Sequence, residues 1–98
     1  MATFITTVQF TEQGIKAVRA TCDRAEALMA TAERLGVKVT GLYWTLGAFD
    51  GVLLCEAADE DTATAVLLHL GSLGNIRTQT ARAFDAAEMQ KVLGLLPR

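Results

Sequence analysis

Alternating apolar and polar positions predict four β-strands in this chain, over residues 3–10, 37–45, 51–57 and 75–84. The first three are rich in β-branched, aromatic and aliphatic residues, which favour strands. The fourth is more polar, so we expect it at an edge of the sheet or beside a wet cavity. Residues 46–51 join the second and third strands in a tight turn that contains Gly47 and Gly51.

Apolar residues spaced three and four positions apart predict a first amphipathic helix over about residues 22–35. Thr21 is a candidate N-cap, and Gly36 suits the left-handed residue just past the end. The predicted buried stripe consists of Ala25, Leu28, Met29, Ala32 and Leu35. Residues 11–20 break the first strand and have room for a short helical turn.

Two further helices follow acidic caps. Asp59 is the predicted N-cap of the second main helix, since acidic residues stabilise the positive end of a helix dipole. Its predicted inner stripe consists of Ala63, Val66, Leu67 and Leu70. Asp85 with Glu88 resembles a capping box and predicts a short C-terminal helix through Leu96, which Pro97 ends.

The order of these elements predicts an α+β fold. Strand, helix, strand, strand, helix, strand and a C-terminal helix fit a ferredoxin-like sandwich, βαββαβ plus one helix, with a four-stranded antiparallel sheet. We expect a single domain over residues 1–98, with both main helices on one sheet face. The other face is then bare. With 51% hydrophobic residues in 98, a second copy packed sheet to sheet is the expected cover, so we predict a homodimer or higher homo-oligomer.

The charge and hydropathy of the chain narrow the range of partners that we expect. A net charge of -2, with no two basic residues adjacent, argues against nucleic acid. No apolar run approaches the ~20 residues of a membrane-spanning helix, and we expect no secretory signal. Cys22 and Cys55 lack C-x-x-C spacing, so we predict two buried free thiols in a reducing compartment. The expected location is the cytoplasm.

No metal or cofactor site is predicted. His69 is the only histidine, and no Cys/His cluster at ligand spacing accompanies it. We expect His69 to have a surface or packing role. Catalytic or haem-ligating work for it is the less favoured alternative.

The remaining candidate chemistry lies on the hairpin and the fourth strand. Asp50 is a general base if buried, or an acceptor for N–H groups of the turn, which we favour. Tyr43 and Trp44 point to opposite faces, as packing residues or as walls of a ligand pocket.

Arg77, Thr78 and Arg82 suggest an anion site on the fourth strand. Arg77 shares one face with Gln79, whereas Thr78 and Arg82 share the other. Arginine binds carboxylates and phosphates through its bidentate fork. The alternatives are a solvated edge strand or a salt bridge between subunits to an acid such as Glu56.

Three blocks, residues 10–15, 43–50 and 71–80, resemble the GYD-domain family, and the resemblance covers nearly the whole chain. Gly47, Phe49 and Asp50 occupy the positions of the glycine, aromatic and aspartate of the family's name, with Phe49 in place of tyrosine. The family is similar to the dimeric α/β-barrel group, which implies a homodimer with facing sheets. It does not imply one activity.

Two functional hypotheses follow. The first is a homo-oligomeric GYD-like domain of uncharacterised function, with a small molecule or anion as a further ligand. The alternative is a cofactor-independent monooxygenase or isomerase that acts on a small apolar substrate through Asp50, Tyr43 or Trp44, and Arg77. The sequence leaves open whether the protein is an enzyme.

Overall fold

The computed structural model describes all residues from Met1 to Arg98. Its four strands form one antiparallel sheet in the order β2-β3-β1-β4. This is the ferredoxin-like order, so the predicted fold is confirmed, and the polar strand β4 does lie at an edge. The strands are β1 (Ala2–Phe10), β2 (Lys38–Trp44), β3 (Gly51–Ala57) and β4 (Ile76–Ala83).

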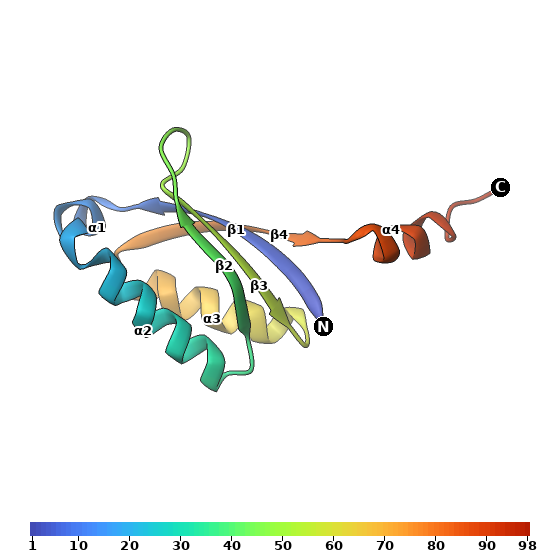
Figure 1. The fold of residues 1–98 in the computed structure, drawn as a ribbon, viewed down its shortest axis with the longest axis horizontal. Coiled ribbons are helices and arrows are strands. Elements are labelled where there is room, and N and C mark those ends of the chain that lie inside the picture. The colour runs from blue at the N-terminus through green and yellow to red at the C-terminus, as the bar shows by residue number, and fades with distance from the viewer.

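The two long helices cover one face of the sheet and leave the other face open (Figure 1). They are α2 (Thr21–Arg34) and α3 (Glu60–Ser72). The short helix α1 (Glu12–Lys16) and a 3-10 turn, η1 (Val18–Ala20), fill the connection for which the sequence predicted a helical turn. The C-terminal helix α4 (Ala86–Leu93) extends away from the sheet. The prediction that it continues through Leu96 to Pro97 is wrong, because it ends at Leu93 with Gly94 as its C-cap. No helix has both the length and the apolar composition needed to cross a membrane.

The core lies between the sheet and the two long helices. Its buried apolar side chains are Phe4, Leu28, Ala32, Val37, Leu53, Cys55, Ala57, Ala63, Val66 and Leu70. Thr6 is fully buried among them, and its hydroxyl lies 2.8 Å from the hydroxyl of Thr80, which meets the hydrogen-bonding need of a buried polar group. The predicted stripe of α2 is wider than the observed one. Met29 and Leu35 remain 39% and 47% exposed because they lie at its margins.

Of Thr21, Gly36, Asp59 and Asp85, the four residues predicted to cap or follow a helix, three are confirmed. Asp59 accepts the N–H of Thr62 and Asp85 accepts that of Glu88, each at 2.8 Å, while Gly36 has a φ of 81°. The prediction for Thr21 is wrong. It has helical dihedral angles and α2 has no side-chain N-cap, because η1 leads directly into the helix.

The two thiols differ in environment. Cys55 is buried in the core, as predicted, whereas Cys22 is exposed. The prediction of two buried thiols is therefore wrong for Cys22, which lies in the first turn of α2. Burial raises the pKa of the Cys55 thiol, because a thiolate is poorly solvated in an apolar core.

The strand register determines which side chains occupy the open face. Ile5 pairs with Leu54 and Tyr43 pairs with Val52, and all four point away from the helices. Ile5 and Tyr43 are 40% and 60% exposed. The centre of the open face is therefore apolar and incompletely covered.

Candidate functional site

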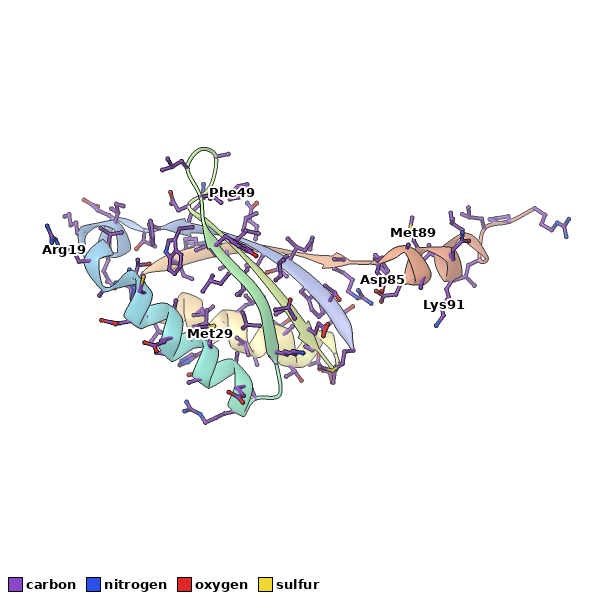
Figure 2. All side chains as sticks on the ribbon, in the orientation of Figure 1. Arg19, Met29, Phe49, Asp85, Met89 and Lys91 are labelled. Atoms are coloured by element: carbon purple, nitrogen blue, oxygen red, sulfur yellow. The ribbon has the colours of Figure 1, made fainter.

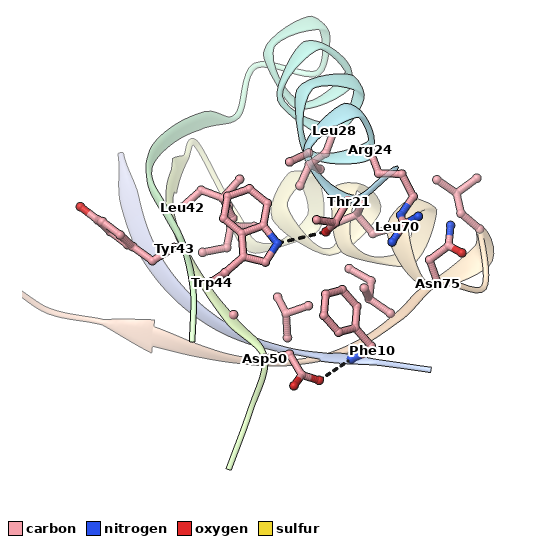
Figure 3. Close-up of a pocket in the computed structure, with 16 residues that line it drawn as sticks. Phe10, Thr21, Arg24, Leu28, Leu42, Tyr43, Trp44, Asp50, Leu70 and Asn75 are labelled. Carbon is pink, nitrogen blue, oxygen red and sulfur yellow. Dashed lines mark hydrogen bonds between the residues drawn. The ribbon is translucent and has the colours of Figure 1, made fainter. Parts of the chain in front are cut away.

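An apolar cleft opens between the sheet and the two long helices, at the end of the sheet where the β2–β3 hairpin emerges (Figure 3). Its volume is about 90 Å³, and 11 of its 16 lining residues are hydrophobic. Phe10, Leu28, Leu42 and Leu70 contribute to its walls. This volume is below the ~300 Å³ at which small-molecule sites commonly begin. The cleft can therefore hold a few apolar atoms, such as a short alkyl chain.

Trp44 forms one wall of the cleft. It ends the edge strand β2, and its indole N–H donates a hydrogen bond to the Thr21 hydroxyl at 3.0 Å. This bond links the edge strand to the start of α2 and orients the ring. The indole remains 47% exposed, so it is accessible to a ligand.

Asp50 also lines the cleft, beside Phe10. Its carboxylate accepts the backbone N–H of Phe10 at 2.8 Å, and its own N–H donates to the Val8 carbonyl at 2.8 Å. We predicted that the carboxylate accepts N–H groups of the turn, and this is wrong. The turn is closed instead by the Thr45 hydroxyl, which donates to the Phe49 carbonyl at 2.7 Å. Asp50 thus ties the hairpin to the end of β1.

The other two family-motif residues lie in the projecting hairpin loop. Gly47 has a φ of 123°, a left-handed conformation that side chains disfavour, and a Cβ added there would meet no atom within 4 Å. Phe49 is half-buried at the base of the loop (Figure 2). Backbone conformation therefore explains the glycine, while the Phe49 carbonyl helps to close the turn and Asp50 connects the loop to β1.

Arg24 is a charged residue of the cleft that the sequence analysis missed. It comes from α2, and its guanidinium donates to the carbonyls of Ala17 at 2.8 Å and Gly14 at 3.4 Å. These bonds fix the α1–η1 segment against α2. Its spacing of four residues from Leu28 was the available signal, because residues four apart share a helix face.

The remaining candidate residues do not converge on the cleft. Tyr43 borders the cavity, but its ring points away from it and belongs to the open face. Arg77 is exposed on the open face, where it pairs in register with Gln9. Thr78 is half-buried on the helix side of β4. The sheet separates these side chains, so they form no common anion site.

Arg82 lies at the far end of β4 and is already paired. Its Nη2 lies 3.0 Å from Glu88 Oε2, and its guanidinium stacks over the Phe84 ring at 4.5 Å. The pair is formed within the chain, with Glu88. His69 is exposed on α3, and no group of three or more His, Cys, Asp or Glu side chains is arranged to hold a metal ion.

A wider groove of about 380 Å³ adjoins the cleft, between α2 and the edge strand β2. Both spaces are lined by Trp44, Leu42 and Ala25. Met29 lines the groove but not the cleft. The groove is open to solvent and mainly apolar. The indole of Trp44 therefore separates a narrow interior cleft from a broad surface groove.

These features define a class: a ferredoxin-like α+β domain with an apolar cleft under the helices and a free, partly apolar sheet face. The GYD domain profile matches residues 4–93, and the chain belongs to that family. It is 33% identical over 90 residues to the "Glutamine synthetase and cystathionine beta-lyase binding protein" of Thermus thermophilus, covering 91% of this chain and 95% of the relative. That relative is named as a protein that binds other proteins.

A solved structure shares the fold. The crystal structure of TTHA0845, also from Thermus thermophilus, superimposes with a TM-score of 0.57 and 25% sequence identity. The match covers 88% of this chain and 96% of that one. The two proteins therefore share the ferredoxin-like arrangement over most of the length of each chain.

Proposed function

We propose that this protein is a binding module that forms a homodimer through its open sheet face and binds a second, different protein. The observation that carries the proposal is the apolar centre of that face. Ile5 and Tyr43 are exposed there beside half-buried Val52 and Leu54. An antiparallel sheet tolerates one solvated face when that face is polar, and the centre of this face is apolar.

The different partner is suggested by the relative. Its name states that it binds glutamine synthetase and cystathionine beta-lyase, and this chain is 33% identical to it. The chain offers no converging set of acid, base and nucleophile that would favour catalysis instead. We therefore propose a metabolic enzyme as the partner.

Solution mass tests the homodimer. We expect light scattering to give twice the 10.5 kDa of the chain. Ile5→Glu places a charge at the centre of the open face and should give a monomer. Leu68→Glu is the matched control, since Leu68 is 70% exposed on α3, away from that face. A monomeric wild-type protein, or a dimer that Ile5→Glu leaves intact, would refute this assembly.

Binding of a different protein needs its own measurement. We expect the purified protein to co-elute with glutamine synthetase or cystathionine beta-lyase from its own organism in size-exclusion chromatography. Neither enzyme co-eluting, at concentrations above about 10 μM where weak complexes persist, would remove these two partners.

A small apolar ligand in the cleft is a second candidate function, favoured by the accessible face of Trp44. The chain has one tryptophan, so its fluorescence reports on the cleft and the adjoining groove, both of which Trp44 lines. We expect hexanol or hexanoate to change Trp44 emission in a saturable manner. Ala25→Leu should abolish the change by filling the space, while Leu68→Ala should not. A response that Ala25→Leu leaves unchanged would exclude the cleft.

A further inference from the structure

Helix α4 stands clear of the rest of the protein as an arm (Figures 1 and 2). None of its residues is buried, and the helix projects from the end of β4 along the long axis of the molecule. The protein measures 54 Å along that axis and 19 Å along the shortest. Its own domain therefore provides no surface on which the helix packs.

The base of the arm is held by specific contacts. Asp85 and Glu88 form a complete capping box, in which each side chain accepts the other's backbone N–H. Glu88 also pairs with Arg82, whose guanidinium stacks over Phe84. These contacts fix how the helix leaves the strand. The arm is thus a defined helical element of the fold.

One side of the arm is apolar and exposed. Met89, Val92 and Leu93 are 46%, 37% and 46% exposed, and Leu96 just beyond the helix is 62% exposed. Their spacing of three, four and seven residues places them on one stripe. An isolated helix below ~12 residues is marginal in water, so an eight-residue helix depends on packing for its stability. This stripe requires a partner surface.

We propose that the arm packs on a second copy of this chain, with the two copies exchanging arms. The proposal rests on the proposed homodimer and specifies a contact within it. Ala81 and Ala83 of β4 lie on the open face, and the arm follows them directly. A copy that covers the open face therefore reaches the base of the arm. Two-fold symmetry gives both arms equivalent sites and leaves no apolar arm unpaired.

The test uses the full chain with a photo-crosslinking amino acid at position 93. We expect irradiation to produce a covalent dimer. Leu93→Glu should raise the dimer dissociation constant about tenfold or more, since burial of a leucine contributes this much. Ala87→Glu is the matched control: it adds the same charge on the opposite side of the helix and should leave the dissociation constant unchanged.

Other outcomes overturn the proposal in distinguishable ways. A dimer by light scattering that gives no crosslink between copies, and that Leu93→Glu does not weaken, refutes the exchange and leaves the homodimer standing. If position 93 crosslinks only to a different protein, then that protein covers the apolar stripe of the arm, and the exchange is also refuted. A chain that stays monomeric at all concentrations refutes the exchange together with the homodimer. Circular dichroism of each variant verifies that the fold is retained.

Discussion

The carboxylate of Asp50 accepts the backbone N–H of Phe10 at 2.8 Å, across 40 residues of sequence. The bond joins the end of the β2–β3 hairpin to the end of β1, where the chain leaves the sheet. Phe10 and Asp50 both line the apolar cleft. One charged hydrogen bond therefore holds together the two segments that form the floor of the cleft.

Removing this acceptor should destabilise the fold. We expect Asp50→Ala to lower the free energy of unfolding by about 1–2 kcal/mol, because the partly buried N–H of Phe10 loses its partner. Asp50→Asn keeps an oxygen acceptor and should cost less. Urea denaturation followed by circular dichroism measures both. Equal stability of Asp50→Ala and wild type would show that the bond contributes nothing.

Gly14 should not tolerate a side chain. A Cβ built on this residue would lie 1.9 Å from the Asn75 carbonyl oxygen, so helix α1 must move away from the residue that precedes β4. We expect Gly14→Ala to cost about 1–3 kcal/mol or more. Gly71→Ala is the control, because nothing lies within 4 Å of its Cβ and alanine favours helices. A Gly14→Ala protein as stable as Gly71→Ala would contradict the close approach.

The two cysteines should react at very different rates. Cys22 is exposed, while burial both hides Cys55 and raises its pKa, and the thiolate is the reactive form. We expect a disulfide reagent to titrate one thiol rapidly in the folded protein and the second only after denaturant is added. In Cys22→Ser the rapid phase should disappear. Two rapid equivalents would mean that the core opens easily around Cys55.

The arm should respond to acid. The N–H of Asp85, and secondarily Arg82, hold the pKa of Glu88 below its ordinary value of 4.5. A carboxyl whose pKa is lowered on folding contributes stability above its unfolded pKa and loses it as pH falls through the folded pKa. Amide signals of α4 should therefore shift toward coil values below about pH 4.5, and Glu88→Gln should lack this transition. Signals that stay unchanged down to about pH 2 would disprove the contribution.

Local patterns predicted most of the architecture. Alternation identified the strands and the two faces on which Tyr43 and Trp44 lie, since side chains alternate along any strand. Asp59 and Asp85 were found as caps because capping involves residues three positions apart. The prediction of Thr21 as an N-cap was wrong because a 3-10 turn directly precedes α2. The sequence had predicted only a short helical turn somewhere in residues 11–20.

The sequence by itself therefore determined the elements, their order and the opposite sheet faces of Tyr43 and Trp44, because these depend on neighbours a few positions apart. The tertiary structure alone decided which distant groups meet. It brought Asp50 to Phe10, Trp44 to Thr21 and Gly14 to Asn75, and it left α4 without an intramolecular surface. Such contacts join residues tens of positions apart, and they form only when distant strands pair and the helices pack on the sheet.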